Sequence, residues 1–198
     1  MQAKGRQALR RDVSQEEKRG EKETMTTEYL LEEQVERVLM LLTPENRLAM
    51  RVALQTGLRI SDVLSIKKSD IDKGAQFWVT EEKTGKRRKV SLPHGLWREL
   101  KAETGARWVF QHRTDPTKHR SRQTVWKDVK RAEKALRLPQ NIGTHSARKV
   151  YAVRLMEKYG SIPRVQRALN HDRYATTMIY AMADTLLTMK HAKPRKKA

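Results

Sequence analysis

Apolar residues recur at helical spacing along most of the chain. After residue 26 they lie three or four positions apart, as one face of a helix requires, at Leu30, Leu31, Val35, Val38, Leu39 and Leu42. A second helix is predicted to follow at once, with Thr43 as its cap and Pro44 at its first position. We expect it to end at Gly57, because glycine readily adopts the left-handed conformation that closes a helix. A short helix is predicted over 61–66.

Residues 76–92 have a different pattern. Two short apolar runs flank the turn-forming residues 83–86, which is typical of a β-hairpin. The helical periodicity then returns and predicts helices over 121–138, 145–159, 162–169 and 174–182. Pro139 ends the first of these and Gly160 closes the second. The predicted fold class is therefore mainly α with one small antiparallel β-sheet (α+β).

The chain divides into three predicted parts. Residues 1–25 are polar and charged, so we interpret them as a flexible arm or the remnant of a linker. Residues 26–184 carry the periodic segments and form one domain, in keeping with a usual domain size of roughly 100–200 residues. Residues 185–198 form a basic C-terminal tail.

Charge narrows the class of partner. The 198 residues include 43 Lys and Arg against 23 Asp and Glu, a net charge of +20. Such an imbalance works against compactness and favours a polyanionic partner, nucleic acid before an anionic membrane surface. There is no apolar run of about 18 residues that could span a bilayer. Cysteine is absent, which excludes disulfides, thiolate metal sites and cysteine nucleophiles. Because the N-terminus has no apolar signal core, we expect a cytoplasmic, nucleoid-associated protein.

Four segments stand out as candidates for chemistry. They are TGLRISDVL at 56–64, EEKTGKRRKV at 81–90, THSARK at 144–149 and LNHDRYATTMIY at 169–180. Each has an ordinary structural interpretation when it is taken alone, such as a capping arginine, a charged turn or a packed histidine. Their order and spacing together favour a functional interpretation.

In that order, the segments resemble the active-site motifs of the tyrosine recombinases, or phage integrases. The resemblance covers residues 26–184 and implies a tyrosine recombinase catalytic domain. The first segment is similar to the motif that supplies a catalytic arginine, here Arg59, with Asp62 as a supporting carboxylate. The second is similar to the hairpin that carries a catalytic lysine, here Lys83.

The other two segments complete the resemblance. The third matches the family's His-x-x-Arg at His145 and Arg148, and the fourth places His171 nine residues before the predicted nucleophile, Tyr180. Asn170 stands where the family usually has glycine. Because asparagine tolerates a left-handed backbone, we expect the turn to be retained.

The resemblance implies a site-specific DNA recombinase that integrates, excises or inverts DNA. Tyr180 attacks the scissile phosphate and leaves a 3′-phosphotyrosine, with Lys83 as the acid for the 5′-oxygen and His145 as the base. His171 hydrogen-bonds a phosphate oxygen. Arg59 and Arg148 clamp the phosphate, because the guanidinium fork matches its geometry.

No cofactor or metal is predicted. Asp62, Asp70 and Asp72 could look like an acidic metal cluster. We interpret Asp62 as support for an arginine and the other two as loop and capping residues.

Double-stranded DNA is the predicted partner. The expected phosphate contacts are basic residues of the hairpin and of the segment after it, namely Lys86, Arg87, Arg88, Lys118, Arg120, Arg122, Lys127 and Lys130. The resemblance also implies a tetramer on DNA, with accessory DNA-bending or directionality proteins as possible partners. The apolar residues of the tail either dock on a neighbouring subunit or pack back in cis.

Several alternatives stay open from the sequence. Most family members have a separate N-terminal DNA-binding domain, so the chain is either a fragment or similar to the short DNA invertases that lack it. A type IB topoisomerase would use the same set of residues to relax supercoils. A non-catalytic DNA binder on the same fold would be expected to have lost at least one of them. An RNA-binding module is disfavoured, because no RNP or KH signature is present.

Overall fold

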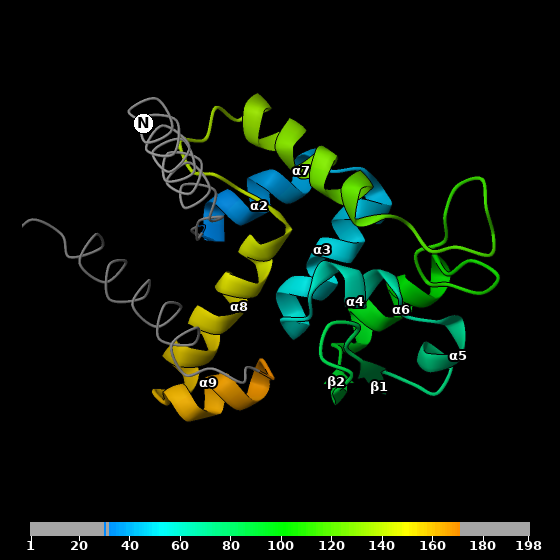
Figure 1. The fold of residues 1–198 in the computed structure, drawn as a ribbon. Coiled ribbons are helices and arrows are strands. Elements are labelled where there is room, and N and C mark those ends of the chain that lie inside the picture. The colour runs from blue at the N-terminus through cyan, green and yellow to red at the C-terminus, as the bar shows by residue number, and fades with distance from the viewer. Residues whose placement is uncertain (1–29, 31, 171–198) are drawn as a thin grey trace, which may run out of the picture.

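The computed structural model describes residue 30 and residues 32–170. His171, Tyr180, the N-terminal arm, the C-terminal tail and the helix predicted over 174–182 lie outside the described residues. The described part is mainly helical with one two-stranded antiparallel sheet, so the predicted fold class is confirmed. Its elements follow in the order α2 (Glu32–Leu41), α3 (Pro44–Thr56), α4 (Ile60–Leu64), α5 (Lys68–Ile71), β1 (Gln76–Thr80), β2 (Arg87–Ser91), α6 (His94–Ala102), α7 (Arg122–Ala135), α8 (Thr144–Tyr159) and α9 (Ile162–Ala168) (Figure 1).

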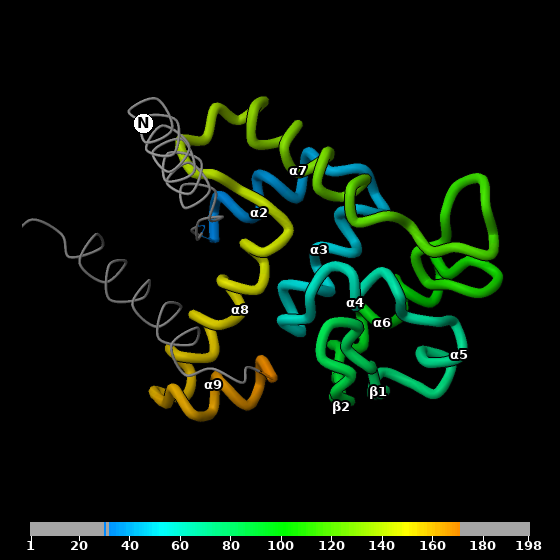
Figure 2. The backbone as a smooth tube through the Cα atoms, in the orientation of Figure 1, coloured from blue at the N-terminus to red at the C-terminus, as the bar shows by residue number. Residues whose placement is uncertain are grey.

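Helix α3 lies at the centre of the fold. Its residues Ala49, Val52 and Ala53 are completely buried, and it contacts α2, α4, α7 and α8. The hairpin and α6 lie on one side of α3, and α8 leads away from it towards α9 (Figure 1). The connection between α6 and α7 projects away from the helices (Figure 2). None of the helices within residues 32–170 is long and apolar enough to cross a membrane.

Gly57 brings α8 close to the end of α3. It closes α3 as predicted, with φ at 63° and its N–H donating to the Ala53 carbonyl at 2.8 Å. A Cβ at this position would lie 2.1 Å from Cδ1 of Tyr151 on α8, so the aromatic ring occupies the space a side chain would need. Both the backbone conformation and the close approach therefore require glycine here.

The hairpin has the predicted position. Thr80 pairs with Arg87, and Phe77 pairs with Val90 on the face that joins the core. The loop between the strands is closed by Glu81, whose N–H donates to the Lys86 carbonyl at 3.0 Å. The Glu81 carbonyl in turn accepts from the Gly85 N–H at 2.8 Å. Lys83 lies inside this closed loop.

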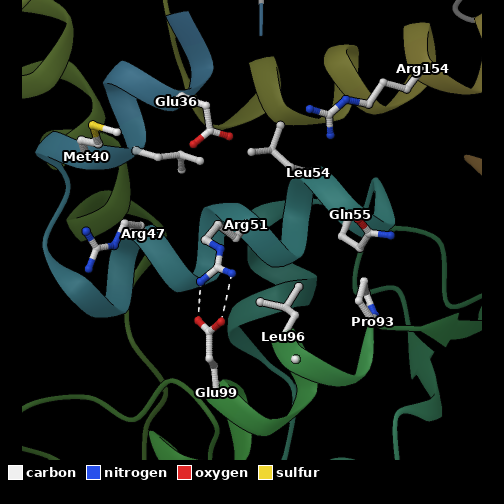
Figure 3. A pocket seen from close by; sticks show the side chains of 12 residues that line it. Glu36, Met40, Arg47, Arg51, Leu54, Gln55, Pro93, Leu96, Glu99 and Arg154 are labelled. Carbon is white, nitrogen blue, oxygen red and sulfur yellow. Dashed lines mark hydrogen bonds and ion pairs between the residues drawn. The ribbon is translucent and has the colours of Figure 1, made fainter. Parts of the chain in front are cut away.

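Two short helices were not predicted. Helix α5 is a single turn, and α6 buries only Leu96 and Leu100, so neither offers enough periodic positions to be recognised. Helix α6 is tied to α3 by Arg51, which donates two hydrogen bonds to Glu99. This ion pair lines a surface pocket formed by α2, α3, α6 and α8 (Figure 3).

Thr43 occupies the predicted N-cap position of α3, but its side chain does not hydrogen-bond the first turn of the helix. The hydroxyl donates instead to the Asp128 carboxylate of α7 at 3.0 Å. The same carboxylate accepts from the Thr43 N–H at 2.8 Å, from Asn46 at 2.8 Å and from Arg131 at 2.7 Å. Asp128 is buried, so these bonds replace the water that it loses. They join α7 to the start of α3.

We expect Asp128→Asn to destabilise the fold by about 2 kcal/mol at neutral pH, because hydrogen bonds to a charged group are lost. Burial works to raise the pKa of Asp128, but the bonds from Asn46, Thr43 and Arg131 outweigh it and lower the pKa. A lowered carboxyl pKa stabilises the fold above the unfolded-state value of about 3.9, and this stabilisation is lost as the pH falls through the folded-state value.

Urea unfolding at several pH values measures this effect. The difference between the wild type and Asp128→Asn should shrink as the pH falls below about 4. Asp72→Asn, at an exposed pair with Lys101, is the control and should stay within about 0.5 kcal/mol of the wild type. A difference for Asp128→Asn that does not depend on pH would contradict the network.

Candidate active site

Arg59 lies where α3 meets α4 and is the N-cap residue of α4. Its Nη1 donates to Oε2 of Glu81 at 2.5 Å and lies 3.9 Å from Oδ2 of Asp62. No other hydrogen bond of its guanidinium is made within the described residues. One end of the fork is therefore held, and the other nitrogens can donate to a ligand.

Asp62 lies beneath Arg59 and is completely buried. Its Oδ1 accepts from the N–H of Glu82 at 2.9 Å, which ties α4 to the loop that carries Lys83. Its Oδ2 accepts no hydrogen bond within the described residues. Burial raises the pKa of Asp62, while the bond from Glu82 opposes the rise.

Arg148 and His145 come from the first turns of α8. Arg148 is buried, and it donates to the Gly57 carbonyl at 2.5 Å and to the Leu169 carbonyl at 2.5 Å. His145 lies one turn earlier and is exposed. Although the residue is exposed overall, the surrounding protein partly desolvates its ring and lowers its pKa, and the positive charges of Arg148 and Arg59 lower it further. A lowered pKa favours the neutral imidazole, which is the form that can accept a proton.

Arg88, one of the predicted DNA contacts, is bonded within the protein. It does not face solvent, because its guanidinium donates to the Ala168 carbonyl at 2.7 Å and also to the Thr56 carbonyl. Arg88 and Arg148 thus join the same two helix ends, the C-termini of α3 and α9, where a cation is favoured. These bonds place Arg88 in the framework of the site, where it holds the two helix ends together.

Two further predicted DNA contacts are engaged within the protein. Arg120 is mostly buried and bonds Asn46 at 3.0 Å, with Glu45 3.3 Å away. Lys130 donates to Glu133 and Asn141. The other predicted contacts are exposed, and they are Lys86, Arg87, Lys118, Arg122 and Lys127. Of these, Lys118 also pairs with Asp115 at 2.8 Å.

Glu81 was not predicted, although it lies at the middle of the site. Its side chain is completely buried, and it follows Phe77 and Val79 at the inward positions of the strand. The alternation of β1 extends through residue 81, so this period of two was the signal that could have found it.

The carboxylates of Asp62, Asp70 and Asp72 have separate partners and do not form a metal site. Asp70 accepts from the Lys67 N–H and caps α5, and Asp72 pairs with Lys101. No group of three metal-binding His, Asp or Glu side chains lies within the part of the chain that the structure describes.

Asn170 adopts the left-handed conformation expected of it, with φ at 54°. Its side-chain amide donates to Oε1 of Glu81 at 3.3 Å. His171 follows it directly in the sequence, but His171 and Tyr180 lie outside the described residues. The described parts of the four motifs therefore lie close together, and the fourth is described only through Asn170.

Two curated relatives match much of the chain. The "Probable integrase/recombinase YoeC" of Bacillus subtilis is 30% identical over 134 residues, which cover 66% of this chain and 74% of that protein. The tyrosine recombinase XerA of Pyrococcus furiosus is 29% identical over 174 residues, which cover 83% of this chain and 59% of that protein. The chain thus spans a little over half the length of XerA.

Solved structures share the fold. The catalytic core of lambda integrase is 26% identical with a TM-score of 0.61, and the match covers 75% of this chain and 93% of that structure. A lambda integrase tetramer bound to a Holliday junction is 25% identical with a TM-score of 0.63, over 77% of this chain and 47% of that one. The sequence model of the phage integrase family matches residues 28–186. The chain therefore belongs to the phage integrase family.

Proposed function

We propose that the chain cleaves and rejoins DNA strands through a 3′-phosphotyrosine intermediate, as a site-specific recombinase. The observation that carries this proposal is the convergence of four segments far apart in the sequence. Arg59, the Lys83 loop and Asn170 bond one pair of buried carboxylates. Arg148 bonds the residues at the ends of α3 and α9, next to the first and last of these segments. Binding of a polyanion alone would not need this arrangement.

The proposed step is a transesterification. The Tyr180 hydroxyl oxygen bonds to phosphorus as the bond between phosphorus and the 5′-oxygen breaks. Neutral His145 takes the phenolic proton, and Lys83 protonates the leaving 5′-oxygen. The reverse attack by a 5′-hydroxyl from another strand releases Tyr180, so no energy source is needed.

Arg59 supports the charge that develops on the phosphate. Its unbonded guanidinium nitrogens suit the non-bridging oxygens, and its charge is permanent. We assign the second positive charge of the clamp to Arg148, whose guanidinium is held in place by the carbonyls of Gly57 and Leu169. His171 is proposed to donate to a phosphate oxygen.

The proposed substrate is double-stranded DNA. Exposed Lys86, Arg87, Lys118, Arg122 and Lys127 would contact phosphates and make binding strongly salt-dependent. A tetramer on DNA is proposed by analogy with the lambda integrase assembly. Such a substrate would place the protein at the nucleoid.

Covalent trapping tests the proposal. The full chain is incubated with supercoiled plasmid in EDTA, denatured with detergent and examined for a protein–DNA adduct. We expect an adduct that survives denaturation and retains the protein on the 3′-phosphate side of the break. The linkage is read by end-labelling the freed 5′-hydroxyl.

Other outcomes favour the alternatives. Gel-shift binding with no adduct, also on DNA nicked to trap the cleaved state, would favour a non-catalytic binder. Relaxation of a plasmid without joining of strands from two sites would favour topoisomerase-like activity.

A further inference from the structure

We propose that Glu81 is a positioning residue that sets the relative placement of Arg59, the Lys83 loop and Asn170, the residue before His171. This inference rests on the proposed function and assigns a role to a side chain outside its catalytic set.

The contacts of Glu81 join the second motif, to which it belongs, to the first and the last. Oε2 accepts from Arg59 at 2.5 Å and from the Thr84 hydroxyl at 3.3 Å, and Oε1 accepts from Asn170 at 3.3 Å. Its backbone closes the loop around Lys83 through Lys86 and Gly85. One residue therefore bonds the first motif, the lysine loop and the start of the last motif.

Burial makes these contacts obligatory. The Glu81 side chain is fully excluded from water, and a buried carboxylate is stable only with partners that replace its hydration. Arg59 supplies the nearest positive charge, and Arg88 lies 4.0 Å away on the opposite oxygen. Because Glu81 engages Nη1 alone, it orients Arg59 without occupying the rest of the guanidinium.

Asn170 gives this chain a link that glycine could not provide. A glycine at φ 54° would follow the same backbone path but would have no amide to donate to Glu81. The side chain therefore fastens the entry to the His171 segment against the hairpin. Asn170→Gly removes the bond without straining the turn.

Single-turnover cleavage and DNA affinity separate positioning from binding. Glu81→Gln keeps the size of the side chain and removes its charge. We expect its bound-state cleavage rate to fall by about tenfold or more, since small misplacements of a catalytic group are costly. The Kd for a fluorescein-labelled duplex should stay within about threefold, because exposed lysines and arginines dominate affinity.

The double variant tests the link to Asn170. Asn170→Gly should slow cleavage by a smaller factor. Its effect should be smaller still in the Glu81→Gln background, since loss of the Glu81 charge already weakens the bond that Asn170 donates. Glu99→Gln is the matched control, because Glu99 pairs with Arg51 in a pocket that shares no residue with the site (Figure 3). It should cleave at the wild-type rate.

The possible results are distinct. A wild type without adduct removes the proposed function. A wild type that forms the adduct, with Glu81→Gln equally fast, overturns the role of Glu81. A loss of cleavage that is explained entirely by weaker DNA binding would also overturn the role of Glu81. Additive effects of Glu81→Gln and Asn170→Gly on the cleavage rate would do the same. If Glu81→Gln does not fold, the Asn170→Gly variant alone decides the matter. Unchanged cleavage by that variant would mean that the bond between Asn170 and Glu81 does not position the site.

Discussion

Tyr180→Phe is expected to abolish covalent capture of DNA while leaving DNA affinity nearly unchanged. Phenylalanine keeps the ring but lacks the oxygen that bonds phosphorus. Loss of the attacking group of a covalent enzyme lowers its rate by far more than loss of a supporting one, here by at least about 10³-fold. Affinity should persist, because it comes from basic side chains on phosphates.

The same segment offers a matched control. Tyr174 lies six residues before Tyr180 and belongs to none of the predicted catalytic positions. Tyr174→Phe should form the adduct as the wild type does, and mass spectrometry of the trapped peptide should place the phosphate on Tyr180. An adduct of normal yield in Tyr180→Phe would mean that another residue is the nucleophile.

Arg148→Lys should destabilise the protein by about 3 kcal/mol, because two charge-assisted hydrogen bonds in the interior are replaced by at most one. Arg148 donates at 2.5 Å to the carbonyls of Gly57 and Leu169. A single ammonium cannot span both as the guanidinium fork does, so one buried carbonyl loses its partner. The free energy of unfolding in urea measures this loss, and cleavage should fall with it.

Another arginine of α8 provides the comparison. Arg154 pairs with Glu32 at 2.8 Å in an exposed position. Arg154→Lys should change the unfolding free energy by less than about 0.5 kcal/mol. If the two substitutions had equal effects, Arg148 would not hold the ends of α3 and α9 together.

Local patterns were sufficient for much of the fold. The start of α3 at Pro44, its end at Gly57 and the hairpin all follow the prediction. So do α8, which closes at Gly160, and the left-handed Asn170. These features depend on propensities and caps that act over a few residues, so they can be read without knowledge of the rest of the chain. The motif order that indicated the family is likewise a property of the sequence alone.

Tertiary structure decided which charges serve the site and which serve the fold. The alternation of β2 places Arg88 on the same face as Val90, but the sequence does not show what it bonds there, which is the carbonyls at the ends of α3 and α9. Those carbonyls belong to residues 32 and 80 positions away in the chain. Glu81 likewise continues the inward face of β1, but only the fold shows that its partner is Arg59, 22 positions earlier. A buried charge takes its role from partners that only the folded chain brings within bonding distance, because burial removes the water that would otherwise satisfy it.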